Sequence, residues 1–140
     1  MNGKIIKIVS NDYTVKLING EIIITKVRGI FRNKNITPLA GDNVTVDIDK
    51  KVINEILPRK NELVRPPVAN IDQALIVTSA VNPEFDSNLL DKMLTIIEYN
   101  NINPVIIITK YDLLKNTEYI DNIIEYYKSI GYEFYINNDI

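Results

Sequence analysis

The sequence predicts a small β barrel followed by the first part of an α/β unit with a parallel sheet. Before residue 60, apolar and polar residues alternate in short runs between turn residues, as in half-buried strands. After residue 70, unbroken runs rich in Ile and Val alternate with segments of helical spacing, as in parallel α/β structures. The charge divides in the same region. Residues 1–67 hold 12 Lys and Arg against 7 Asp and Glu, whereas residues 68–140 hold 4 against 11, which indicates two modules with different partners.

The barrel is expected to have five short strands. From Tyr13 to Leu17, for example, apolar residues alternate with polar ones. The expected strands cover residues 3–9, 13–17, 21–27, 44–48 and 52–57. Asn19 and Gly20 both tolerate a positive φ, which predicts a two-residue type I′ turn between the second and third strands. Five strands without a convincing helix fit a barrel of the OB type, and periodicity leaves an SH3-like barrel as the alternative.

Prolines mark the change to the second unit. Three of them lie between residues 58 and 67, where they favour extended backbone and cannot donate to a strand ladder. Residues 59–70 are therefore interpreted as a linker, with one domain at 1–67 and the next at 68–140. The basic residues of this segment either extend a phosphate-binding track or belong to a polar linker.

The second unit is expected to have the order β-α-β-α-β. The expected elements are strands at 73–78, 104–109 and 132–136 and helices at about 87–97 and 117–130. Asp86 or Ser87 is a suitable N-cap for the first helix, and Gly131 ends the second. The first two strands are apolar throughout, as in strands buried on both faces. Three strands and two helices are too few for most nucleotide-binding domains of this class, so the unit is interpreted as incomplete.

Composition excludes several kinds of chemistry. The chain contains no Cys and no His, so it has no disulfide, no thiolate or imidazole zinc site, and no nucleophile of the Cys or Ser-His type. No segment reaches the roughly 18 to 20 continuous apolar residues that cross a bilayer. No secretory signal is visible at the N-terminus, and a cytoplasmic protein without a membrane partner is expected.

The sharpest local motif is Thr-Lys-x-Asp. Thr109, Lys110, Tyr111 and Asp112 follow an apolar strand, at the carboxyl end where ligands of open α/β sheets bind. The carboxylate of Asp112 can accept hydrogen bonds from N1 and N2 of guanine, whereas adenine has an acceptor at N1 and no N2 amine. Lys110 can lie along the base plane and reach toward the ribose. The alternative is that Lys110 and Asp112 belong to a solvated strand-to-helix turn.

A basic segment at the third strand is the candidate contact with nucleic acid. Lys26, Arg28, Arg32 and Lys34 can neutralise phosphates, and the basic character of the whole N-terminal half favours RNA binding. Phe31 lies among them and is interpreted as a core residue rather than a stacking platform for a base. The alternative for the cations is a solvated edge strand whose charges discourage edge-to-edge pairing.

Several longer motifs carry a resemblance to a known family. They cover residues 27–32, 38–44, 56–61 and 63–73. In this order they closely resemble the ribosome small-subunit-dependent GTPase A family (RsgA), and the resemblance runs through nearly the whole chain. That family has an N-terminal OB fold, a circularly permuted GTPase domain and a C-terminal zinc domain. Permutation places its guanine-reading motif before its phosphate-binding loop.

The resemblance implies a guanine site. The Asn-Lys-x-Asp motif of the family falls on Thr109 to Asp112. Lys110 and Asp112 match it, whereas Thr109 replaces the usual Asn and lacks the amide that supports the base. A Ser-containing loop that contacts guanine should follow near residues 137–139, where this chain has no Ser. The phosphate-binding loop, the switch segments and the zinc ligands are expected beyond Ile140.

The resemblance also implies a function. A member of this family binds rRNA and GTP with Mg²⁺, hydrolyses GTP, and acts in late maturation of the small (30S) ribosomal subunit. The expected partners are that subunit with its rRNA and guanine nucleotide, and neither DNA nor a membrane is expected. The chain contains no G-x-x-x-x-G-K-[ST] loop, so it has no expected catalytic residue and should not hydrolyse GTP alone. The alternative function is a non-enzymatic OB-fold RNA-binding remnant.

Overall fold

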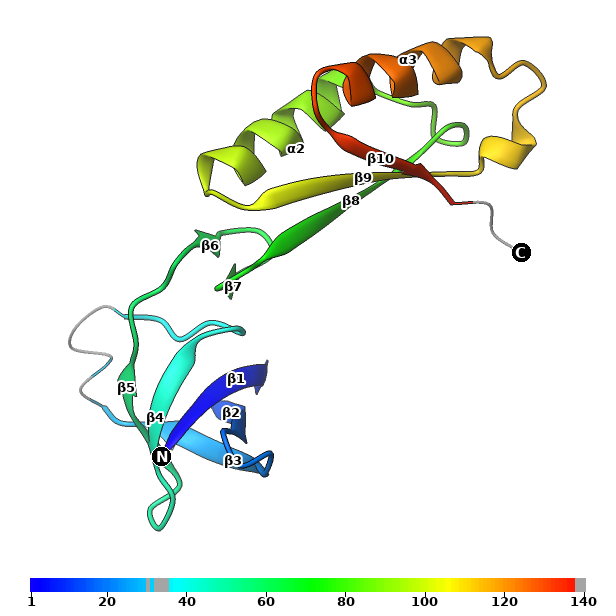
Figure 1. Cartoon of the computed structure of the whole chain (residues 1–140). Coiled ribbons are helices and arrows are strands. Elements are labelled where there is room, and N and C mark those ends of the chain that lie inside the picture. The colour runs from blue at the N-terminus through cyan, green and yellow to red at the C-terminus, as the bar shows by residue number, and fades with distance from the viewer. Residues whose placement is uncertain (30, 32–35, 138–140) are drawn as a thin grey trace. The chain divides into compact units, whose positions relative to one another are not determined.

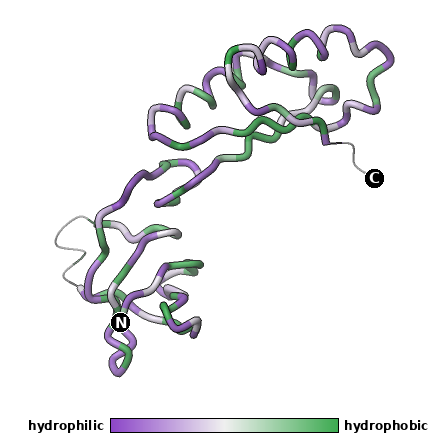
Figure 2. Tube along the Cα trace, viewed as in Figure 1, coloured by the Kyte–Doolittle hydropathy of each residue, from purple (hydrophilic) through white to green (hydrophobic). Residues whose placement is uncertain are grey.

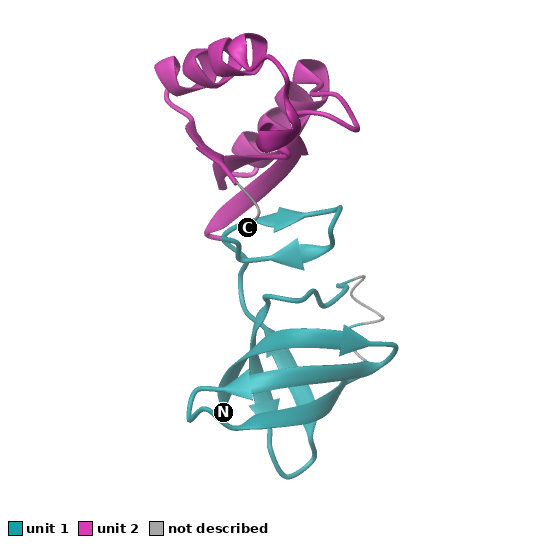
Figure 3. Cartoon of the chain, turned by 90° about the vertical axis from the view of Figure 1, so that its right-hand side faces the viewer, with its two compact units in different colours: residues 1–71 teal, residues 72–140 magenta. Residues whose placement is uncertain are grey.

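The computed structural model describes residues 1–29, 31 and 36–137. The chain forms two compact units, one of residues 1–71 and one of residues 72–140 (Figure 3). None of the helices in the described part of the chain is long and apolar enough to cross a membrane.

Unit 1 is built on a closed barrel (Figure 1). Its strands are β1 (Asn2–Val9), β2 (Asp12–Leu17), β3 (Ile22–Val27), β4 (Asn43–Asp47) and β5 (Val52–Ile56). Strand β1 pairs antiparallel with both β2 and β4, and β3 pairs with β5 in parallel, which gives the order β1-β2-β3-β5-β4. This connectivity confirms the OB-type barrel and removes the SH3-like alternative.

The alternation seen in the sequence places every second side chain inside the barrel. Ile5, Val15, Val44 and Ile53 are completely buried. Phe31 is only 6% exposed and belongs to the same cluster, so the prediction that it is a core residue is confirmed. The barrel core is therefore aliphatic, with Phe31 and Tyr13 as its aromatic members.

The turn between β2 and β3 differs from the predicted type I′ turn. The backbone φ is positive at Gly20 (+90°) but not at Asn19. The amide of Gly20 donates to the carbonyl of Leu17 (2.9 Å), and the amide of Leu17 donates to the carbonyl of Glu21 (2.7 Å). These bonds enclose a three-residue loop in which only the last residue needs a positive φ. The Asn-Gly pair thus predicted the hairpin correctly and its turn type wrongly.

The segment after β5 is more ordered than the predicted linker. It contains a short hairpin of β6 (Glu62–Leu63) and β7 (Val68–Ala69), with the last two prolines in its turn. Prolines lack the amide donor, but a turn position does not require one. The boundary expected after residue 67 falls within this hairpin, immediately before β7.

The β6–β7 hairpin is attached to the loop that precedes β4. The amide of Ala69 donates to the carbonyl of Ala40 (2.9 Å), and the side chain of Asn70 donates to the carbonyl of Gly41 (3.0 Å). A Cβ on Gly41 would lie 2.0 Å from the carbonyl oxygen of Ala69, and its φ is +93°. Glycine at position 41 therefore allows the close approach as well as the backbone conformation.

A buried ion pair fastens the same junction. Asp42 is completely buried, and its two carboxylate oxygens accept from Nε and Nη2 of Arg59 at 2.7 and 2.8 Å. Arg59 also contacts Glu62 and donates to the carbonyl of Thr37 (2.8 Å). The hydrogen bond to Asp42, followed by that to Glu62, raises the pKa of Arg59 above its ordinary value despite the opposing effect of burial. Arg59 is thus a structural residue rather than part of a phosphate track.

Unit 2 is a three-stranded parallel sheet with two helices. Its elements are β8 (Gln73–Ser79), α2 (Ser87–Tyr99), β9 (Asn103–Thr109), the 3₁₀ turn η1 (Tyr111–Leu113), α3 (Glu118–Ser129) and β10 (Glu133–Ile136). The strand order is β10-β9-β8, and both pairings are parallel. This arrangement confirms the predicted partial α/β unit. Asp86 caps α2 by accepting from the amide of Leu89 (3.1 Å), and Gly131 follows α3 with a φ of +103°.

The sheet of unit 2 is covered on one face, so the prediction that β8 is buried on both faces is wrong. Ile76, Ile106 and Phe134 point to the covered face and are at most 5% exposed. Leu75 and Val77 point the other way and are 59% and 63% exposed. Figure 1 shows both helices on one side of the strands, and Figure 2 shows the hydrophobic character of β8 and β9. Continuous apolar runs reflect two faces that suit burial, but whether each face is covered depends on which elements are present.

Candidate functional site

The predicted guanine motif lies at the carboxyl edge of the parallel sheet. Thr109 ends β9 and is paired in register with Ser79, which ends β8. On the other side, the amide of Asn137 donates to the carbonyl of Ile108 (2.8 Å), so the segment after β10 begins beside the same edge. Parallel strands place all their carboxyl ends together, which explains why segments distant in sequence meet here. The rest of the expected second guanine loop, residues 138 and 139, lies outside the described residues.

Thr109 holds the ends of β8 and β9 together. Its hydroxyl donates to the carbonyl of Thr78 (3.3 Å), and its own carbonyl accepts from the amide of Ala80 (2.9 Å). The Thr109 side chain is therefore directed to the neighbouring strand. The hydroxyl of Thr109 is able to make this contact, so the side chain at position 109 helps to shape the edge of the sheet.

Lys110 turns the chain out of the sheet. Its backbone has a φ of +58°, which is uncommon for a residue with a side chain and marks a sharp change of direction after β9. Its ammonium donates to the carbonyl of Asn82, in the loop after β8. The lysine thus links two of the loops that form the edge. Asn82 was not identified from the sequence, and the Asn-Pro pair at 82–83, which favours a turn, is the signal that could have indicated a loop there.

Asp112 is presented by an anchored turn. Tyr111 begins η1, and its hydroxyl donates to Oδ1 of Asp121 on α3 at 2.6 Å. Asp112 follows in the first turn, is exposed, and makes no hydrogen bond or ion pair with any described residue. A carboxylate in this state has its full acceptor capacity available for a ligand with paired donors. The two side chains that precede it, those of Lys110 and Tyr111, are held by hydrogen bonds, whereas the Asp112 carboxylate is left open.

The predicted RNA-binding cations are only partly described. Lys26 forms an ion pair with Asp12, and Nη2 of Arg28 lies 3.9 Å from Oδ2 of Asp47. Both are surface ion pairs whose cations are exposed. Such pairs are weak, and the cation can exchange its carboxylate for another anion. Arg32 and Lys34 lie outside the described residues. The structure therefore does not bring the four predicted cations into one described cluster.

Two other cations were missed by the sequence reasoning. Lys4 of β1 and Lys16 of β2 are opposite each other in the strand register. Their separation in sequence hides this proximity, which depends on how the two strands pair. The register of the hairpin formed by the first two strands is the signal that could have indicated them, because it places residues of one strand opposite residues of the other.

Comparison with known proteins identifies the family. A family model described as RsgA GTPase matches residues 56–139, and a second, described as RsgA N-terminal domain, matches residues 2–53. The chain belongs to the RsgA family. The two matched ranges correspond to the α/β unit with the segment leading into it, and to the barrel.

Curated relatives from the RsgA family are similar along most of the chain. A protein of Oceanobacillus iheyensis named small ribosomal subunit biogenesis GTPase RsgA 2 is 52% identical over 93% of this chain and 46% of its own length. A Bacillus pumilus protein named small ribosomal subunit biogenesis GTPase RsgA is 46% identical over 99% of this chain and 49% of its own. The chain thus spans about half the length of these curated relatives.

Solved structures of similar proteins share the fold. One is YloQ, described as a circularly permuted GTPase, with a TM-score of 0.79 and 44% identity over 96% of this chain and 50% of that one. Another is YjeQ from Thermotoga maritima, with a TM-score of 0.79 and 34% identity over 96% of this chain and 51% of that one. The similarity to a circularly permuted GTPase agrees with the order expected for this chain.

Proposed function

We propose that this chain is the rRNA-binding and guanine-reading portion of a GTPase that acts in late maturation of the small (30S) ribosomal subunit. Membership of the RsgA family and the names of the curated relatives support this role. The RsgA GTPase match over residues 56–139 favours it over a non-enzymatic RNA-binding remnant. The small subunit with its rRNA, in the cytoplasm, is the proposed partner, and no DNA or membrane takes part.

The observation that carries the guanine assignment is the open carboxylate of Asp112. It lies just beyond the carboxyl end of β9, on a turn anchored through Tyr111, and has no partner among the described residues. Two parallel acceptors on one carboxylate match the N1 and N2 donors of guanine. Adenine would leave the carboxylate poorly paired, which disfavours it. Lys110, held at the loop after β8, would flank the base, and Thr109 would keep the two strand ends together.

Hydrolysis belongs to the longer protein in this proposal. GTP is the substrate, and this chain supplies recognition of its base. Among the described residues, no three Asp or Glu side chains gather in a way that could hold a metal ion, so these residues do not fit a Mg²⁺ site by themselves. A zinc domain of the family is likewise no property of this chain, which has neither Cys nor His. The chain alone is expected to bind guanine nucleotide weakly and to hydrolyse none.

The barrel is proposed to bind rRNA. Lys26, Arg28, Arg32 and Lys34 are the proposed phosphate contacts, supported by the excess of Lys and Arg over Asp and Glu in residues 1–67. The exposed ion pairs of Lys26 and Arg28 are weak enough to open when a phosphate replaces the carboxylate.

The test of the guanine site is a change of base specificity. In Asp112→Asn, the side-chain amide offers one acceptor and one donor. Xanthine has a carbonyl where guanine has the N2 amine, so the variant should bind xanthosine diphosphate in preference to guanosine diphosphate. Chemical shifts of the backbone amides of residues 109–113 would be followed as each nucleotide is added, with adenosine diphosphate as a third ligand. Glu125→Gln removes one exposed negative charge from α3 and is the matched control.

The expected result is a reversal of the guanine-to-xanthine preference in Asp112→Asn and none in Glu125→Gln. Equal binding of guanosine and adenosine diphosphates by the unaltered chain would refute the guanine assignment. So would an Asp112→Asn variant that keeps the original preference.

A further inference from the structure

Two lysines face each other on the outer surface of the barrel. Lys4 of β1 lies directly opposite Lys16 of β2 in the antiparallel register. Like charges in this position destabilise a strand pair. Neither ammonium has a carboxylate partner among the residues that the structure describes. The pair is therefore a positive site that the described fold does not neutralise.

Several other cations of unit 1 do have a carboxylate partner. Lys26, Arg28 and Arg59 each lie within ion-pair distance of an Asp side chain. Of these pairs, the one between Arg59 and the buried Asp42 is structural, whereas those of Lys26 and Arg28 are exposed. Lys7 of β1 also lacks a carboxylate partner among the described residues, but it is paired in register with Thr14 rather than with a second cation. What distinguishes Lys4 and Lys16 is that two unneutralised charges face each other, which makes the pair suited to an outside anion.

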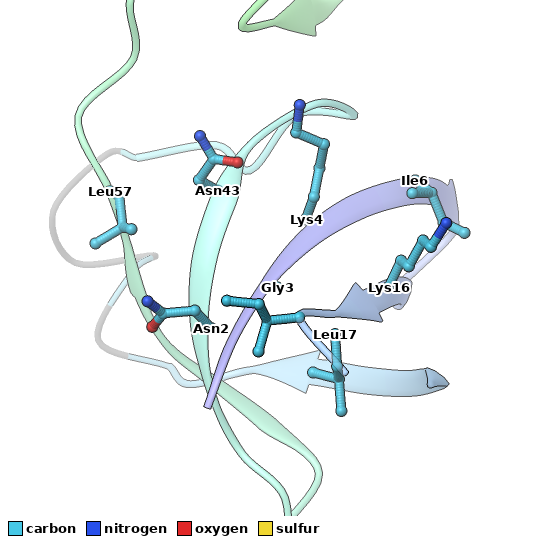
Figure 4. Close-up of a pocket in the computed structure, with 9 residues that line it drawn as sticks. Asn2, Gly3, Lys4, Ile6, Lys16, Leu17, Asn43 and Leu57 are labelled. Atoms are coloured by element: carbon cyan, nitrogen blue, oxygen red, sulfur yellow. The ribbon is translucent and has the colours of Figure 1, made fainter. Parts of the chain in front are cut away.

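The lysines border a hollow of about 380 Å³ on the barrel (Figure 4). Strand β1 pairs with β2 on one side and with β4 on the other, and Lys4 is opposite Asn43 of β4 in that second pairing. Lys16, Lys4 and Asn43 therefore form a row across three strands. Figure 4 shows Lys4 and Asn43 extending in the same direction from neighbouring strands. Asn2 adds a second amide to the lining, and Leu17 and Leu57 add apolar surface.

The composition of the hollow indicates which part of a nucleic acid it suits. Its lining consists of Lys, Asn, Gly, Ile and Leu residues and includes no aromatic side chain, so it offers no platform on which a base could stack. Ammonium groups and amides are suitable donors to phosphate oxygens and ribose hydroxyls, and the aliphatic groups can contact the sugar. These features match an RNA backbone rather than its bases.

We propose that Lys4 and Lys16, with the amides of Asn2 and Asn43, bind the sugar-phosphate backbone of RNA. The inference rests on the proposed function, in which the barrel binds rRNA, and adds a second contact distinct from the basic segment at 26–34. Because phosphates are common to every sequence, this site contributes affinity and orientation but no sequence preference. RNA would also relieve the repulsion between the two lysines.

The test is the salt dependence of RNA binding by the 140-residue chain. The probes are two labelled RNA hairpins of equal length with different stem sequences, and binding is followed by fluorescence anisotropy between 50 and 200 mM salt. In Lys4→Ala/Lys16→Ala, the slope of log K against log salt should flatten by about 1.4 to 1.8, as expected for two phosphates. Both hairpins should lose affinity equally. Lys92→Ala/Lys128→Ala removes the same charge from exposed positions of α2 and α3 and should leave the slope unchanged.

Three further measurements separate the possible results. The thermal midpoint of the lysine variant should be unchanged or higher, because a repulsive pair is removed, so lost binding cannot be assigned to unfolding. If Arg28→Ala weakens binding while Lys4→Ala/Lys16→Ala does not, this site is refuted and the proposed function stands. If the unaltered chain binds neither hairpin, the proposed RNA-binding function itself fails. Amide shifts at Lys4 and Lys16 that appear with inorganic phosphate but not with RNA, at equal ionic strength, would also refute the backbone site.

Discussion

Removing Arg59 should destabilise unit 1 strongly. Asp42 is completely buried, and Arg59→Ala would leave its carboxylate with the amide of Leu39 (2.7 Å) as its one hydrogen-bond donor among the described residues. Breaking a buried pair by removing one partner costs about 3 to 5 kcal/mol, because the other charge stays buried and uncompensated. Most domains have a free energy of unfolding of only about 5 to 15 kcal/mol, so the loss is a large share of the total.

The comparison that isolates burial is Arg28→Ala. Arg28 forms an ion pair with Asp47 on the same barrel, but its side chain is 48% exposed and the two atoms are 3.9 Å apart. Exposed pairs of this kind contribute about 0 to 1 kcal/mol. The double variant Asp42→Ala/Arg59→Ala should cost less than the sum of its single variants, since no unpaired charge remains.

Native-state hydrogen exchange of the barrel amides is the suitable assay, because α2 and α3 both belong to unit 2 and dominate the helical signal in circular dichroism. The expected loss corresponds to exchange that is faster by a factor of roughly 100 to several thousand in Arg59→Ala. Amides of unit 2 serve as the internal control. If Arg59→Ala loses no more protection than Arg28→Ala, Asp42 reaches water or another cation, and the reasoning from burial is refuted.

Two further predictions concern other contacts. Gly41→Ala should lower the free energy of unfolding by more than the roughly 1 to 2 kcal/mol of a left-handed residue, because its Cβ would also collide with the carbonyl of Ala69. Gly29→Ala is the control and should be neutral, because Gly29 has open space around it and no positive φ. Hydrogen exchange at the amide of Ala69 is the measurement, and equal effects of the two variants would contradict the steric argument. In unit 2, burial and then the hydrogen bond to Asp91 raise the pKa of Tyr127, so the folded state holds that proton more tightly and the free energy of unfolding should fall as pH rises above about 10. Tyr127→Phe should lose about 1 kcal/mol of unfolding free energy at neutral pH, and its stability should fall less at alkaline pH. Urea unfolding followed by the helical signal between pH 8 and 11 is the measurement. An unchanged alkaline decline in stability would assign the effect to other groups, such as Tyr132, whose pKa burial also raises.

Local pattern was sufficient for much of the fold. The alternation from Tyr13 to Leu17 predicted β2 because a strand places successive side chains on opposite faces. Helical spacing predicted α2 and α3, and Asp86 was recognised as a cap because its role depends only on the next few residues. Asp112 was predicted as a site residue in the same way, from its position directly after an apolar strand.

Contacts between distant residues required the tertiary structure. Sequence reasoning left Arg59 between a phosphate track and a linker, since nothing near it in sequence marks Asp42 as its buried partner. It expected β8 to be covered on both faces, because an apolar run shows what a face can bury but not what covers it. Lys4 and Lys16 became neighbours only through the register of β1 and β2. Amino-acid sequence by itself predicted the strands of the barrel, the strands and helices of unit 2 and the Asp86 cap, because these follow from the spacing of residues a few positions apart. Tertiary structure decided which charges are paired, buried or left open, because that depends on pairings that bring distant segments together.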